Sequence, residues 1–139
     1  MVEPRRVRAL LEIIEAQTRL LKGLAAMSAE DLLADPYRIA AAKYLFLVAI
    51  EASIDASRHI ATSAGLRAAT DFADSFVVLG EAGRIEADLV ERLKDMARFR
   101  NLLVHGYAVV DDARVVEILK TQLHDLDEFR QSLTQTEPD

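Results

Sequence analysis

Residues 35–63 read DPYRIAAAKYLFLVAIEASIDASRHIATS, and this stretch predicts the longest helix of the chain. Asp35 is suited to cap a helix, and Pro36 is suited to its first turn, where a backbone N–H is not needed. Apolar residues then recur at helical spacing, and Gly65 follows as a stop signal. A helix that ends at about Ser63 is therefore expected, which favours an all-α fold.

The flanking segments show the same helical spacing of apolar residues, and short connections place successive helices antiparallel. We therefore expect an antiparallel helical bundle of four to five main helices. It should form one domain over residues 1–133, followed by a flexible tail over residues 134–139. The expected helices cover residues 4–22 (ended by Gly23), 35–63, 71–79 (capped by Thr70 or Asp71), 86–106 and 112–129, with a short element at 28–33 capped by Ser28.

The composition is typical of a soluble globular protein, with 51% apolar and 29% charged residues in 139. The absence of cysteine excludes a disulfide framework, thiolate metal sites and cysteine nucleophiles. The first residues lack the apolar stretch of a signal peptide, and the apolar run over residues 39–50 is too short to cross a bilayer. We therefore expect a cytoplasmic protein without a membrane span. The net charge of −6 argues against broad, non-specific binding of nucleic acid but leaves a locally basic cleft open.

Residues 96–107 read MARFRNLLVHGY and place a permanent cation, an amide, an imidazole and a phenol in an otherwise apolar stretch. On a regular helix Arg100 and His105 point about 140° apart, so one straight helix cannot aim both at one atom. Either the helix ends near Gly106 and His105 swings round, or a second copy of the chain supplies the other half of the site. The structural interpretation is that both residues only satisfy carboxylates in buried pairs.

Glu51, Asp55 and His59 follow one another at four-residue spacing and so share one face of the long helix. This spacing is typical of an ion-pair network on a helix surface. In a functional interpretation, which we favour, the carboxylates hold Arg100 or fix the tautomer of His105.

The histidines of the chain do not predict a metal site. His59, His105 and His124 fall in different helices, and no Glu-x-x-His pair of the kind used by di-iron bundles is present. His124 and Asp125 are instead expected on a solvated polar face.

Residues 96–107 resemble the Arg-x4-His-x-Tyr signature of HepT-like proteins, a branch of the HEPN superfamily. Residues 49–59 are similar to the second-helix pattern of that family, and residues 79–83 to the stretch before its motif helix. The resemblance covers residues 4–133, and the three segments agree in order and distance. It implies an all-α homodimer encoded beside a minimal nucleotidyltransferase antitoxin, in a family where several members are metal-independent ribonuclease toxins.

The resemblance also implies roles for individual residues. Arg100 and His105 would be catalytic, and Tyr107 would receive AMP from the antitoxin, which silences the toxin. No cofactor and no metal would be needed. The implied supporting residues are Asn101, Glu51 and Asp55.

The expected function is therefore that of a toxin that acts as an endoribonuclease on RNA. The 2′-hydroxyl would attack the phosphorus, an imidazole would move a proton, and Arg100 would stabilise the phosphorane. Two facing copies would supply two histidines, one for each proton transfer. The alternative is a non-catalytic dimeric helical adaptor that presents nucleotide or substrate to a partner nucleotidyltransferase, with Arg100 as an anion clamp.

Overall fold

The computed structural model describes residues 4–106 and 110–136, and within them every regular element is a helix. The prediction of an all-α fold is therefore confirmed. The helices are α1 (Pro4–Ala25), α2 (Ala29–Leu33), α3 (Pro36–Ser63), α4 (Phe72–Glu81), α5 (Ala87–His105), α6 (Asp112–Thr121) and α7 (Leu123–Thr136).

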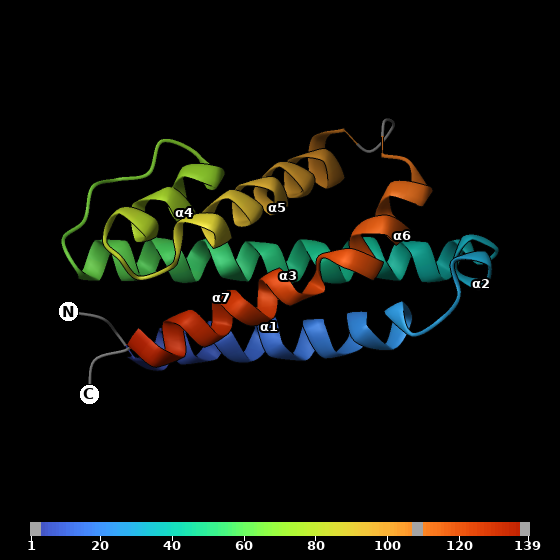
Figure 1. Ribbon diagram of the computed structural model, residues 1–139, viewed down its shortest axis with the longest axis horizontal. Coiled ribbons are helices and arrows are strands. Elements are labelled where there is room, and N and C mark those ends of the chain that lie inside the picture. The colour runs from blue at the N-terminus through green and yellow to red at the C-terminus, as the bar shows by residue number, and fades with distance from the viewer. Residues whose placement is uncertain (1–3, 107–109, 137–139) are drawn as a thin grey trace.

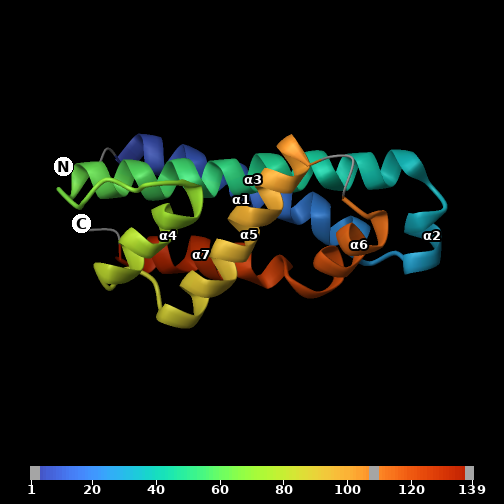
Figure 2. The ribbon, with the colours of Figure 1, turned by 90° about the horizontal axis from the view of Figure 1, so that it is seen from above.

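The long helix α3 runs through the whole length of the molecule, and the other helices pack around it (Figure 1). Helix α1 lies antiparallel beside α3, and α7 lies along α1. Helices α4 and α5 cover another side of α3, with α5 also antiparallel to it. The short helices α2 and α6 lie together at one end, as the view from above also shows (Figure 2). The bundle is antiparallel, as predicted.

The expected helix starts are confirmed by capping hydrogen bonds. Asp35 accepts from the Tyr37 N–H at 2.9 Å, and Asp71, rather than Thr70, accepts from the Asp74 N–H at 2.7 Å. Further caps of this kind are made by Ser28 and Asp111. These short polar side chains satisfy backbone donors that a helix leaves without partners, so they fix where each helix begins.

The main differences from the predicted helix boundaries are three. Helix α1 continues through Gly23, because burying the apolar face of the helix outweighs the small intrinsic cost of a glycine. The expected last helix is divided at Gln122 into α6 and α7, with neither a glycine nor a proline to mark the break. Helix α7 also extends to Thr136, into the segment expected to be a tail. The division at Gln122 and the short α2 raise the number of helices above four or five.

Two aromatic contacts fix how the helices cross. Phe46 of α3 and Phe99 of α5 meet edge to face, with ring centroids 5.4 Å apart. Phe76 of α4 and Phe129 of α7 form a similar pair at 5.6 Å. All four rings are buried. Such pairs combine a large buried apolar area with a preferred geometry, so they hold α5 on α3 and α4 on α7 in one relative orientation.

Arg92 of α5 is bound to two acidic residues of α7. Its guanidinium donates to Asp125, whose side chain is only 2% exposed, and to Glu128 at 2.9 Å. The hydrogen bonds from Arg92 lower the pKa of Glu128. The expectation that Asp125 lies on a solvated face was therefore wrong: the helix packing buries this carboxylate, and Arg92 compensates its charge.

Arg67 binds the segment that leads into α4 to the helix itself. It binds both carboxylate oxygens of Asp74, at 2.7 and 2.9 Å, and also Glu81 at 2.9 Å. The hydrogen bonds from Arg67 hold the pKa of the Asp74 carboxyl well below its usual range and lower that of Glu81 in the same way. A paired fork of this kind fixes direction as well as distance, so it sets the start of α4.

No helix among the described residues is both long enough and apolar enough to span a bilayer.

Replacing Arg92 by Met should destabilise the fold by about 3 kcal/mol, because Asp125 would stay buried without its main cation. Urea unfolding followed by circular dichroism measures this free energy. The matched control is Arg19→Met, which removes an exposed pair with Glu15 and should cost less than about 1 kcal/mol. Equal losses in the two variants would show that burial does not matter here.

The ion pairs of Arg67 with Asp74 and Glu81 should make the free energy of unfolding depend on pH. Both carboxyls have folded pKa values below their unfolded values, so their stabilisation is complete above about pH 4.5 and is lost as the pH falls further. The Asp74→Asn variant should be less stable than the unaltered chain at pH 7 and lose less stability between about pH 4.5 and pH 2. Unfolding measured across this range tests the prediction, which parallel curves for the two proteins would contradict.

Candidate functional site

Arg100 is held against α3 by Glu51. Because Phe99 points into the core, the next residue, Arg100, lies at the flank of α5 that faces α3. Its Nε and Nη2 donate to Oε2 of Glu51 at 3.1 and 2.6 Å, and the arginine side chain is only 13% exposed. The structure thus places Glu51 where one of the expected supporting roles, that of holding Arg100, requires it.

Phe72, the first residue of α4, contacts two arginines. The Cζ of Arg100 lies 4.6 Å from the centroid of the ring, and that of Arg58 lies 4.8 Å from it. The Nε of Arg58 also donates to the hydroxyl of Ser75 at 3.1 Å. Cation–π contacts of this kind orient guanidinium groups without consuming their hydrogen-bond donors. Phe72 therefore brings a cation of α3 and a cation of α5 to one place.

His105 is the last residue of α5, with Gly106 as its C-cap, and its side chain is exposed. It lines an open cavity of about 500 Å³ together with Arg100 and Arg58. Helix α5 therefore ends next to Gly106, as one of the two expected arrangements requires, but His105 itself stays helical. The arrangement in which a second copy of the chain completes the site stays a prediction. The structural interpretation fails for His105, which makes no ion pair with a carboxylate among residues 4–106 and 110–136.

Asn101 explains how a cavity can reach both residues although they point about 140° apart. It lies one position after Arg100 and four before His105, so its side chain occupies the sector between them. Its Oδ1 accepts from Nη1 of Arg100 at 3.2 Å, and it lines the same cavity. The site therefore covers a broad sector of the last turns of α5 rather than one narrow stripe.

Asp55 and His59 differ in their relation to the site. Asp55 is exposed and lines a smaller adjoining cavity of about 220 Å³ with Glu51, Phe72 and Arg100. His59 lines neither of these two cavities, and its buried Nε2 has no hydrogen-bond partner among the described residues. The predicted ladder on α3 thus contributes its two acids to the site but not its histidine.

Tyr107 lies outside the described residues. Two residues that the sequence did not single out, Arg58 and Phe72, line the cavity. Arg58 follows Asp55 by three positions and Glu51 by seven, so an inspection of this helix face could have found it. Phe72 comes from a separate helix, and no local signal indicates it.

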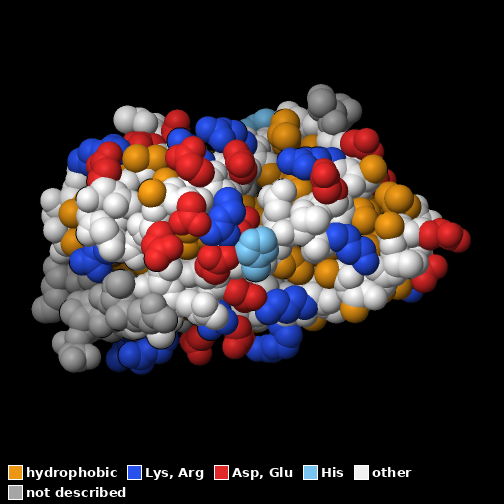
Figure 3. Space-filling view, in the orientation of Figure 1, with side chains coloured by type: hydrophobic (Ala, Val, Ile, Leu, Met, Phe, Trp, Pro, Cys, Tyr) orange, Lys and Arg blue, Asp and Glu red, His pale blue; other side chains and the backbone are white. Residues whose placement is uncertain are grey.

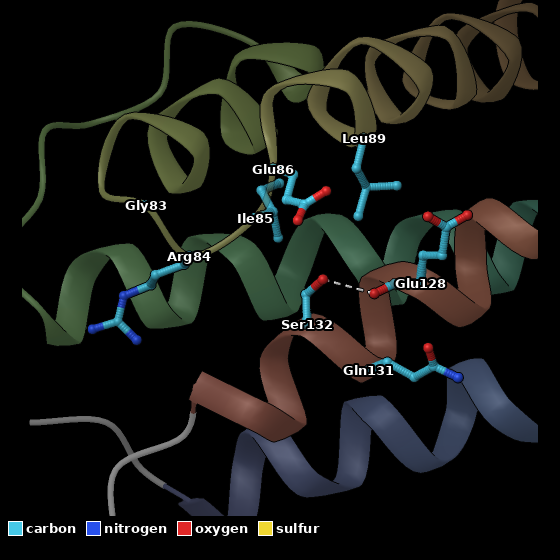
Figure 4. Close-up of a pocket in the computed structure, with 8 residues that line it drawn as sticks. All are labelled: Gly83, Arg84, Ile85, Glu86, Leu89, Glu128, Gln131 and Ser132. Atoms are coloured by element: carbon cyan, nitrogen blue, oxygen red, sulfur yellow. Dashed lines mark hydrogen bonds between the residues drawn. The ribbon is translucent and has the colours of Figure 1, made fainter.

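A second hollow of similar size lies away from this site, between the α4–α5 connection and α7 (Figure 4). Glu86 and Glu128 line it, and the side chain of Arg84 points away from the Glu128 end. Two carboxylates make it unsuitable for a phosphate. A group of possible metal ligands, His124, Asp125 and Glu128, also lies nearby, but Arg92 already binds both of its acids.

Charges are interspersed over the face that Figure 3 shows, with acidic side chains beside basic ones. Against that background, the cavity lined by two arginines and a histidine is a local concentration of cationic and titratable groups. The acidic residue that shares the lining, Asp71, is engaged in capping α4. The arrangement is suited to bind an anion such as a phosphate, with an imidazole at hand to move a proton.

The chain is similar to known proteins in sequence and in fold. A curated mRNA nuclease HepT from Shewanella oneidensis is 33% identical over 79 residues, which cover 57% of this chain and 59% of that relative. The match therefore spans less than two thirds of the relative.

Solved structures share the fold at lower sequence identity. A tri-AMPylated HEPN toxin from Shewanella oneidensis, in complex with an MNT antitoxin, superposes with a TM-score of 0.86 at 22% identity, over 94% of this chain and 97% of that one. A cytosolic protein of unknown function, YutE from Bacillus subtilis, gives 0.84 at 17% identity, over 99% and 96%. The family model for HepT-like ribonucleases matches residues 10–133, and the chain therefore belongs to the HepT-like ribonuclease family.

Proposed function

We propose that this chain is the toxin of a toxin–antitoxin pair and cuts RNA without a metal ion. The observation that carries the proposal is the open cavity lined by both Arg100 and His105, the two residues expected to be catalytic. Membership of the HepT-like ribonuclease family supports it. So does the relative from Shewanella oneidensis, which is an mRNA nuclease.

The reaction is a transesterification within the RNA strand. The 2′-oxygen forms a bond to phosphorus while its proton passes to a base, and the bond from phosphorus to the 5′-oxygen breaks as that oxygen takes up a proton. The products are a 2′,3′-cyclic phosphate and a 5′-hydroxyl. Arg100 stabilises the extra negative charge of the phosphorane, since its guanidinium stays protonated and is already oriented by Glu51 and Phe72. The imidazole of His105, which can both accept and donate a proton, moves a proton.

A homodimer completes this scheme, because two proton transfers call for two imidazoles and each copy brings one His105. Apolar surface beside the motif supports the pairing: Leu102, between Arg100 and His105 in the sequence, is 46% exposed. A second copy that covers Leu102 would bring its own cavity close to the first. In this arrangement Asn101 and Asp55 position the groups that touch the RNA.

The partner of the toxin is a minimal nucleotidyltransferase antitoxin that transfers AMP to Tyr107. The AMPylated toxin of Shewanella oneidensis, observed with an MNT antitoxin, supports this part of the proposal. A phosphate placed beside Arg100 and His105 would neutralise the cation and fill the space that the scissile phosphate needs. Both partners act in the cytoplasm, where ATP and RNA are available.

Expression of the isolated chain should stop cell growth, and Arg100→Ala or His105→Ala should relieve the arrest. With purified protein, each variant should lower the rate of RNA cleavage at least about 100-fold, because a charge stabiliser or a proton-transfer group is lost. The control is Arg98→Ala, which removes an exposed arginine of the same helix and should keep full activity.

Cleavage should continue in EDTA and leave 5′-hydroxyl ends. A requirement for Mg²⁺, with 5′-phosphate products, would contradict the mechanism. A harmless isolated chain that cuts no RNA would favour the adaptor instead.

Mass spectrometry should find added AMP on Tyr107 when the chain is co-expressed with its nucleotidyltransferase and ATP is present. The modified protein should cut RNA at least about 10-fold more slowly, since the new phosphate occupies the site. Tyr107→Phe should keep nuclease activity and escape silencing, because it lacks the accepting oxygen. Modification of Tyr37 or Tyr44 instead, which are both exposed, would refute the assignment.

A further inference from the structure

Three cavities adjoin one another along one face of α3. Arg100 and Phe72 line both the cavity of about 220 Å³ and that of about 500 Å³. Arg58 lines the latter and a third cavity of about 350 Å³. The α3 residues that line the row include Glu51, Asp55, Arg58 and Thr62, whose spacing of four, three and four places them on one helical face over about 16 Å.

Arg58 lines both the second and the third cavity, and some of its N–H donors have no partner among the described residues. Its Nε is engaged by Ser75, and its guanidinium stacks on Phe72. Neither Nη atom has a hydrogen bond or an ion pair with a described residue. A guanidinium that is oriented by stacking and keeps both Nη groups free is well prepared to bind a phosphate.

The third cavity has a different character from the other two. Its lining includes the apolar side chains of Ala61, Leu66 and Val78, together with the hydroxyl-bearing Thr62 of α3. A mainly apolar hollow with a few polar groups suits a flat, partly polar ring such as a nucleobase.

We infer that the substrate lies along α3 as a single strand, with one nucleotide beyond the cleavage point bound by Arg58 and the third cavity. The scissile phosphate would lie at Arg100 and His105, the neighbouring phosphate at Arg58, and the flanking base between Leu66 and Val78. This inference rests on the proposed function and adds a binding subsite to it. A duplex would not fit, because the base must leave its stack to enter the cavity.

The test uses short oligonucleotides that carry one ribonucleotide in an otherwise deoxy strand, so that cleavage can occur at one bond only. One series extends a dinucleotide on the 5′ side and another on the 3′ side, and kcat/KM is measured for each. With the full-length unaltered chain, extension on one side should raise kcat/KM about tenfold. This gain corresponds to one charge-assisted phosphate contact.

Arg58→Gln should remove that gain, so that the ratio of kcat/KM for the extended and the dinucleotide substrates falls toward one, mainly through KM. Thr62→Phe should also reduce it by filling the third cavity. Arg19→Gln, a distant exposed site on α1, should keep the full ratio. Circular dichroism checks that every variant is folded.

Equal kcat/KM for all lengths in the unaltered chain, or an unchanged ratio in folded Arg58→Gln, would overturn the subsite while leaving the nuclease intact. Absence of any cleavage by the unaltered chain would overturn the proposed function and the subsite together.

Discussion

The edge-to-face contact of Phe46 and Phe99 fixes the crossing of α5 over α3, on which the candidate site depends. Both rings are buried, so the crossing cannot shift without opening the core. The residue that follows Phe99 is Arg100, and Glu51 follows Phe46 by just over one turn of α3. The same contact that builds the core therefore brings the guanidinium and its carboxylate to hydrogen-bond distance. Site and core are fixed by the same packing.

The site concentrates positive charge locally on a chain whose net charge is negative. A net charge of −6 repels a polyanion at long range, but salt screens such repulsion beyond about 10 Å, so local charges govern contact with RNA. Arg58 and Arg100 converge on one aromatic ring, which orients both without neutralising either. Glu51 does offset part of the charge of Arg100, and it also prevents the arginine from swinging into solvent. An oriented cation is worth more to a developing phosphorane than a mobile one, since it needs no reorganisation during the reaction.

Helix starts were predictable because they depend on local chemistry. Asp35, Asp71 and Asp111 each cap the helix that follows, and the hydrogen bond involved spans only two or three residues. The break at Gln122 was not predictable in this way. Leu119 and Leu123 are both buried and continue one apolar spacing, yet they belong to different helices, because each helix follows its own neighbours across the core.

The sequence by itself determined the all-α class, the caps and the motif from Arg100 to His105, since each rests on residues close together in the chain. Only the tertiary structure decided that Phe72 and Arg58 join the site and that Asp125 is buried. It also decided that His59 stays outside the site. These outcomes depend on contacts between segments far apart in sequence, and hydrophobic spacing specifies which face of a helix is covered but not which residue covers it. Helix geometry places Arg100 and His105 about 140° apart, and only the tertiary structure shows that one open cavity is lined by both, with Asn101 between them.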